Sequence, residues 1–80
     1  MDTEAYILIV TKFGKTKEVA NKLIDLEFVE DVRELYGQYD IIIKLRASDF
    51  KKLEDMIAEN IRVIDDIERT ETLVVSDVPS

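Results

Sequence analysis

The sequence has no cysteine and no histidine among its 80 residues. The lack of cysteine excludes disulfide bonds, thiolate nucleophiles and zinc–thiolate sites, and the lack of histidine excludes imidazole acid–base catalysis. Glycine-rich phosphate loops and calcium loops with ordered acidic spacing are also absent. The acidic pairs Glu30–Asp31 and Asp65–Asp66 are consecutive, so their side chains point apart in an extended backbone. We therefore expect no catalytic residue, no metal site and no cofactor.

Positive charge is scarce. The sequence has 11 lysines and arginines and 18 acidic residues, so its net charge is −7. This charge repels nucleic acid and no basic patch offsets it, so we expect no direct binding to DNA or RNA. No apolar run approaches the roughly 20 residues that span a bilayer, and the N-terminus lacks a basic signal-peptide region. We expect a cytoplasmic protein without a membrane partner. A charged content of 36% with one glutamine and two asparagines favours a thermophilic source.

The length predicts one small domain over residues 1–80 with a thin core, which many such domains complete by oligomerising. Residues 5–10 form a continuous apolar run rich in β-branched side chains, which predicts a strand buried on both faces. Phe13 and Gly14 interrupt it. Residues 15–26 then place apolar side chains at helical spacing, with charged residues on the opposite face.

The second half of the chain predicts two further strands, a helix and a last strand. In residues 29–36 apolar residues recur every third position, which fits a strand that contains a β-bulge. Gly37 and Gln38 connect it to a strand over residues 39–46, as in a hairpin. Ser48 is a suitable N-cap for a helix with an apolar stripe from Phe50 to Ile61. Residues 67–75 form the last strand, with Thr70, Thr72 and Val74 on one face.

This β-α-β-β-α-β order predicts an α+β, ferredoxin-like fold with a four-stranded antiparallel sheet and two helices on one face. The uncovered face of the sheet would expose the apolar residues Tyr6, Leu8 and Val10 of the first strand. Because contiguous apolar patches usually mark interfaces, we expect a second copy to pack there, sheet against sheet. The alternative is that edge loops or the C-terminal tail cover this face.

Two stretches carry motifs of a known family. Residues 36–45, Tyr-Gly-Gln-Tyr-Asp-Ile-Ile-Ile-Lys-Leu, resemble the G-x-Y-D-hydrophobic-Lys hairpin of the ligand-binding (RAM) domain in Lrp/AsnC transcription regulators. Residues 67–75 resemble the last strand of that domain, with its V-x-x-T-x-T pattern. Two single residues also match that domain. Val29 matches the apolar residue that opens its second strand, and Gly14 matches the glycine before its first helix. The resemblance covers about residues 4–76. Full regulators carry an N-terminal helix-turn-helix domain, whereas the first strand here begins near Met1, so the chain resembles a stand-alone, prokaryotic version.

The resemblance implies a fold, an assembly and a ligand class. It implies a ferredoxin-like domain whose copies dimerise sheet against sheet, as in a dimeric α/β barrel, and a ring of dimers. It implies that an amino-acid effector binds between dimers. Full-length Lrp/AsnC regulators are further candidate partners through mixed assembly. The residues expected at the effector are Gly37, Gln38, Tyr39, Asp40, Thr70, Thr72 and Val74.

Each candidate residue also has a structural explanation that stays open. Gly37 is explained by the hairpin alone, because a hairpin turn needs the backbone freedom of glycine. Tyr39 is explained as an aromatic side chain that is half-buried on a strand. Asp40 is able to bond the turn backbone, or to pair with an α-ammonium group. Thr70 and Thr72 are good strand formers. From their position we expect Asp40→Ala to weaken effector binding and to leave the fold and the dimer intact.

The sequence analysis thus predicts a non-enzymatic amino-acid-sensing and oligomerisation domain that modulates transcription regulation. Two alternatives stay open. One is an assembly module without an effector, which a collapsed cleft beside residues 37–40 would favour. The other is a dimeric ferredoxin-like enzyme of the monooxygenase type, although such enzymes usually use a polar or histidine-bearing cavity and this chain has no histidine.

Overall fold

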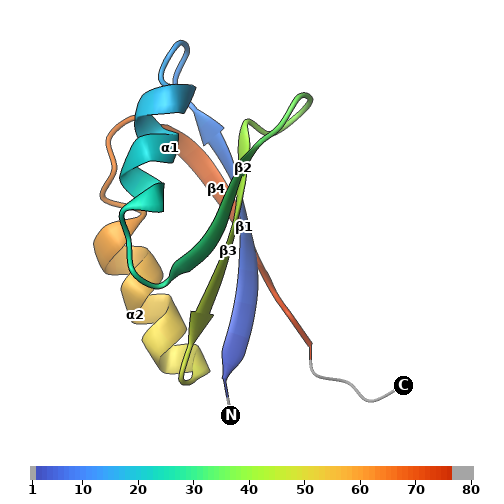
Figure 1. Cartoon of the computed structure of the whole chain (residues 1–80), viewed down its shortest axis with the longest axis vertical. Coiled ribbons are helices and arrows are strands. Elements are labelled where there is room, and N and C mark those ends of the chain that lie inside the picture. Colours follow the sequence, from blue (N-terminus) through green and yellow to red (C-terminus); the bar gives the residue numbers. More distant parts are fainter. Residues whose placement is uncertain (1, 77–80) are drawn as a thin grey trace.

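The computed structural model describes residues 2–76 and contains two helices and four strands in the predicted order (Figure 1). The apolar run near the N-terminus is strand β1, which is longer than predicted because Thr3, Glu4 and Thr11 extend its pairing. The elements are β1 (Thr3–Thr11), α1 (Thr16–Ile24), β2 (Val29–Glu34), β3 (Ile41–Ala47), α2 (Phe50–Asn60) and β4 (Ile67–Val74).

The strands form one antiparallel sheet in the order β2-β3-β1-β4. Both helices lie on the same face of this sheet, and the opposite face is open (Figure 1). The α+β, ferredoxin-like βαββαβ prediction is therefore confirmed. Among the described residues, no helix has the length and apolar character needed to cross a membrane.

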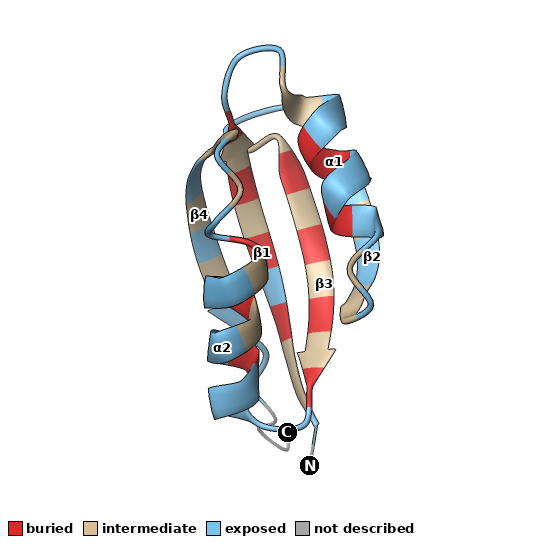
Figure 2. Cartoon of the chain, turned by 90° about the vertical axis from the view of Figure 1, so that its left-hand side faces the viewer, coloured by how far each residue is buried: buried red, intermediate tan, exposed pale blue. Residues whose placement is uncertain are grey.

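The core lies between the helices and the covered face of the sheet. From Ala5 onward in β1, and throughout β3, every second residue is buried beneath the helices, as the alternating red bands in Figure 2 show. Val19 and Leu23 of α1 and Leu53 and Ile57 of α2 complete this layer. The residues buried on the covered face of β1 and β3 are Ala5, Ile7, Ile9, Thr11, Ile41, Ile43, Leu45 and Ala47.

Two local predictions can be compared with the structure. The β-bulge predicted in the second strand is present, because the pairing of β2 with β3 shifts register between Val29 and Asp31. The predicted N-cap of the second helix is wrong by one residue. Asp49 is the N-cap, with its carboxylate accepting a hydrogen bond from Lys52 N at 2.8 Å. Aspartate caps a helix as well as serine does, so residue type alone did not distinguish Ser48 from Asp49.

Candidate functional site

Asp40 stands at the point where three segments of the chain meet. Its Oδ2 accepts hydrogen bonds from Thr11 N at 2.9 Å and from Thr11 Oγ1 at 3.2 Å. The Thr11 hydroxyl also lies 2.8 Å from the hydroxyl of Thr16, the first residue of α1. The Asp40 backbone N–H donates to Ile9 O at 2.9 Å. The side chain and backbone of Asp40 therefore join the β2–β3 connection to the end of β1.

A hollow of about 350 Å³ lies beside Asp40. The β1–α1 turn forms one side of it, with Lys12, Phe13 and Gly14, and Gly14 adopts a positive φ of 76° there. The residues that line it include two acids, Asp40 and Glu68, and one base, Lys12. A carboxylate has about four acceptor positions, so Asp40 has acceptor capacity beyond the two bonds that its Oδ2 receives from Thr11. The hollow thus offers acceptors and a cationic donor together.

Tyr39 points away from this hollow, onto the open face of the sheet. Its hydroxyl donates to Glu71 Oε1 at 2.7 Å, and Glu71 is the β4 partner of Leu8 on that face. This hydrogen bond, followed by partial burial and the charge of Glu71, raises the pKa of Tyr39. The adjacent residues Tyr39 and Asp40, which the sequence analysis assigned to one site, therefore serve opposite faces of the sheet.

Gly37 and Gln38 lie in the exposed β2–β3 connection, where Gly37 has a positive φ of 138°. This connection and the β1–α1 turn project from the same end of the molecule (Figure 1). Each presents a fully exposed aromatic side chain, Tyr36 and Phe13 respectively. The positive φ accounts for Gly37 by backbone conformation alone.

The helix-covered face of β4 carries Thr70, Thr72 and Val74. The three residues thus share one face of the strand, as expected. They pair with Ile9, Ile7 and Ala5 of β1. Asp40 contacts Ile9 from the opposite side of β1, through its backbone N–H. Two strand spacings, roughly 10 Å, therefore separate Asp40 from Thr70 within one chain. The structure brings Asp40 together with Thr11, Thr16, Lys12 and Glu68, and not with the two threonines of β4.

The open face of the sheet has an apolar centre. Leu8, Val10 and Ile42 are partly buried there, and Tyr6 and Leu73 are 36% and 45% exposed. Tyr6, Leu8 and Val10 thus lie on the uncovered face, where the sequence analysis placed them. Their role in a dimer remains a prediction.

One end of the open face carries a network of ion pairs. Lys44 Nζ lies 3.3 Å from Glu4 Oε1, and Arg46 Nε lies 2.9 Å from Glu30 Oε2. Arg46 also reaches Glu4, at 3.3 Å. The hydrogen bond from Arg46 lowers the pKa of Glu30, and the hydrogen bond to Glu4 raises the pKa of Lys44. Glu30 and Lys44 therefore stay charged near neutral pH.

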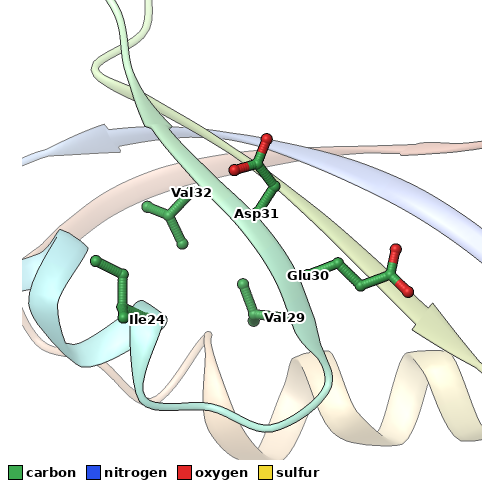
Figure 3. A pocket seen from close by; sticks show the side chains of 5 residues that line it. All are labelled: Ile24, Val29, Glu30, Asp31 and Val32. Atoms are coloured by element: carbon green, nitrogen blue, oxygen red, sulfur yellow. The ribbon is translucent and has the colours of Figure 1, made fainter.

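A second hollow of about 300 Å³ lies between α1 and the edge strand β2. Figure 3 shows Ile24, Val29 and Val32 pointing toward one another there, whereas the carboxylates of Glu30 and Asp31 point away. This apolar hollow lacks groups that would orient a zwitterion. Among residues 2–76, no three carboxylates gather as they would around a metal ion.

The sequence analysis did not identify Lys12, Thr16, Glu68 or Glu71 as site residues. Thr11 and Thr16 are five residues apart across the turn at Gly14, and that turn was the one available signal. Lys12 and Glu68 line the same hollow from different parts of the chain, and the pairing of β1 with β4 shifts register beside Glu68, between Val10 and Thr11. No sequence pattern announces that irregularity.

Comparisons with known proteins agree on one family. The model of the Lrp/AsnC ligand binding domain matches residues 4–80. The HTH-type transcriptional regulator FL11 of Pyrococcus furiosus is 35% identical over 71 residues, which are 89% of this chain and 46% of that protein. Regulatory protein AsnC of Escherichia coli is 33% identical over 81 residues, covering 98% of this chain and 52% of that protein. The chain spans about half the length of the curated relatives it matches.

A solved structure agrees with these sequence matches. The crystal structure of FFRP-DM1 superposes with a TM-score of 0.89 at 36% identity and covers 92% of this chain and 99% of that chain. The match therefore extends over nearly the whole fold.

Proposed function

Because the chain belongs to the Lrp/AsnC ligand-binding domain family, we propose that it is a non-enzymatic sensor that binds a free amino acid and modulates transcription regulation. Its curated relatives are transcription regulators, which supports the regulatory role. The chemistry of the hollow beside Asp40 supports the choice of ligand.

The observation that carries this proposal is the pairing of opposite charges around one hollow. A zwitterion needs acceptors for its ammonium group and donors for its carboxylate. Asp40 and Glu68 supply the acceptors, and Lys12 supplies a cationic donor. Charge-assisted hydrogen bonds of this kind are roughly twice as strong as neutral ones.

Thr11 orients the acceptor in this proposal. Its backbone N–H and hydroxyl bond the same oxygen, Oδ2 of Asp40, and thereby limit the rotation of the carboxylate. Thr11 is only 6% exposed, so these bonds form largely away from water. The ammonium group of the ligand would meet the acceptor positions of Asp40 that Thr11 does not occupy.

We further infer that the domain acts as an assembly. A second copy would cover the apolar centre of the open face and form a dimer. The hollow beside Asp40 lies at the end of the molecule where Phe13 and Tyr36 are fully exposed. A neighbouring dimer in a ring would cover these aromatic side chains and close the hollow over the effector. Gly37, Gln38, Thr70, Thr72 and Val74 would then act through contacts between dimers.

A thermal-shift screen of the twenty amino acids tests the proposal, because a ligand that binds only the folded state raises the melting temperature. We expect one or a few amino acids to raise it. Asp40→Asn should reduce the affinity about ten- to a hundredfold, since a charged hydrogen bond contributes roughly 1.5–3 kcal/mol. The amide oxygen of asparagine is still able to accept from Thr11 N, which protects the fold.

Asp25→Asn is the matched control, because Asp25 is exposed at the far end of α1. It should leave both the melting temperature shift and the affinity unchanged. A screen in which no amino acid stabilises the wild type would reject the sensor proposal. If the protein still dimerises in that case, an assembly module without an effector is the better account, and the bonds from Thr11 explain Asp40 by structure alone.

A further inference from the structure

A β-bulge in the pairing of β1 with β4 stands beside the candidate hollow of about 350 Å³. Val10 pairs with Arg69 on one side of this bulge. The next residue of β1, Thr11, pairs with Ile67, so Glu68 is an extra residue without a partner on β1. Bulges often re-aim a side chain next to a binding or active site. Glu68 is exposed and lines the hollow, so the irregularity of β4 adds an acidic residue to it.

The charged residues that line the hollow are Asp40, Glu68 and Lys12, which give its lining a formal net charge of −1. Arg69 follows Glu68 in sequence but does not offset this charge. It pairs with Val10 of the open face, where its charge acts on the Tyr39 hydroxyl. Among residues 2–76, neither Glu68 nor Lys12 has an ion-pair partner. The hollow therefore has one acid more than its single base balances.

We propose that the effector is an amino acid with a cationic side chain, lysine or arginine, and that Glu68 binds the cationic group. The proposal rests on the amino-acid sensor of the proposed function and adds the class of effector. All amino acids share an α-ammonium and an α-carboxylate group, which need one acceptor and one donor. Asp40 and Lys12 supply these, and Glu68 is then the acceptor left for the side chain of the effector.

Other side chains fit this balance of charge less well. An apolar side chain would remove water from Glu68 without offering it a partner, which is unfavourable. An acidic side chain would be repelled by Glu68 and by the net charge of −7 of the whole chain. A cationic side chain offers Glu68 a charge-assisted hydrogen bond, which is roughly twice as strong as a neutral one.

The shape and lining of the hollow also suit a long cationic side chain. Phe13 lines the hollow with a fully exposed ring, whose face is able to receive an ammonium or guanidinium group in a cation–π contact. The space beside Gly14 is open, since no atom lies within 4 Å of the position that a Cβ would take there. The volume of about 350 Å³ lies in the range of small-molecule pockets, roughly 300–1,000 Å³.

Calorimetry with lysine and norleucine tests the class of effector. Norleucine keeps the aliphatic chain of lysine and lacks its terminal ammonium group, so the pair isolates the contact with Glu68. We expect lysine to bind about ten- to a hundredfold more tightly, the range that a charged hydrogen bond contributes. Arginine should also bind more tightly than norleucine, and glutamate should bind more weakly.

Substitutions of Glu68 assign this preference to one residue. Glu68→Gln should lower the ratio of lysine to norleucine affinity about tenfold, because its amide carries no negative charge. Glu68→Lys should reverse the charge preference, so that glutamate binds more tightly than lysine. Glu54→Gln is the matched control, because Glu54 is an exposed glutamate on α2 and the change in net charge is the same. It should leave the ratio unchanged.

The possible results distinguish the class of effector from the sensor itself. A preference for lysine and arginine that is lost in Glu68→Gln and kept in Glu54→Gln would support the proposal. An equal loss in both variants, or an unchanged preference in Glu68→Gln, would overturn the role of Glu68. A wild type that binds a neutral or acidic amino acid more tightly than lysine would overturn the class of effector and leave the sensor in place. A wild type that binds none of the twenty amino acids would overturn both.

Discussion

The two faces of the sheet are made by alternate residues of the same strands, yet they differ in solvent exposure and in charge. On the covered face, Ile7, Ile9 and Ile43 are at most 1% exposed, whereas Tyr6 on the open face is 36% exposed. The open face also carries Lys44 beside its apolar centre. The covered face therefore stabilises the single chain, and the open face has the composition of an interface, apolar at the centre and charged at the rim.

The difference shows why apolar alternation is a poor guide in β1. All six residues from Ala5 to Val10 are apolar or aromatic, so the sequence distinguishes neither face by type. The two faces differ only because the helices pack on one of them. The residues of β1 on that face are buried in the core, and those on the other face are left at the surface. Substitutions of neighbouring residues in β1 should therefore give qualitatively different results.

The largest expected effect is on the covered face. Ile7→Ala should lower the free energy of unfolding by about 2–5 kcal/mol, because it leaves a cavity in a fully buried layer. Leu8→Ala, one residue along the strand, should cost less because Leu8 is only partly buried in the single chain. Urea unfolding at a concentration low enough to dissociate any dimer measures both. Equal losses at the two positions would contradict the contrast between the faces.

The second effect is on assembly. Tyr6→Ala should raise the dimer dissociation constant about tenfold or more, since aromatic side chains near the centre of an interface contribute most of its binding energy. The far-ultraviolet circular dichroism of the monomer should not change, because Tyr6 lies outside the core. Sedimentation at several concentrations provides the measurement. Phe50→Ala, which removes a half-exposed aromatic side chain from α2 on the other side of the sheet, is the matched control.

Much of the fold was predictable because it follows from the pattern of apolar residues. The continuous apolar run of residues 5–10 indicated β1, and the three-residue spacing after Val29 indicated a bulged strand. The site was less predictable, because side-chain direction in a connection depends on the backbone path. Tyr39 and Asp40 are adjacent in sequence, and the structure directs one to Glu71 and the other to Thr11.

The expectation that Asp40→Ala would leave the fold intact is changed by these contacts. Removing the carboxylate leaves the Thr11 N–H without its acceptor in a residue that is 6% exposed. We expect a loss of about 1–3 kcal/mol in the free energy of unfolding, the usual cost of an unsatisfied buried donor. Asp40→Asn should lose less, because its amide oxygen accepts the same bond. Similar losses in both variants would show that charge, and not the hydrogen bond to Thr11, stabilises this end of the sheet.

The smallest effect concerns the one hydrogen bond that links the β2–β3 connection to the open face. The bond from Tyr39 to Glu71, with partial burial and the charge of Glu71, raises the pKa of Tyr39 above its usual value of 10.0. A raised pKa in the folded state means that the contribution to stability is complete below pH 10. It is lost as the pH rises through the higher folded-state pKa.

Alkaline titration of phenolate absorbance in the wild type and in Tyr39→Phe isolates this group, with Tyr6 and Tyr36 common to both proteins. The difference curve should have its midpoint above 10. Glu71→Gln should move the midpoint down, because the amide is able to accept the hydrogen bond but carries no charge to oppose the phenolate. A midpoint at the ordinary value in the wild type would show that Tyr39 is not bonded to Glu71 in solution. The open face would then lack the Tyr39–Glu71 hydrogen bond, which is the contact that links it to the β2–β3 connection beside Asp40.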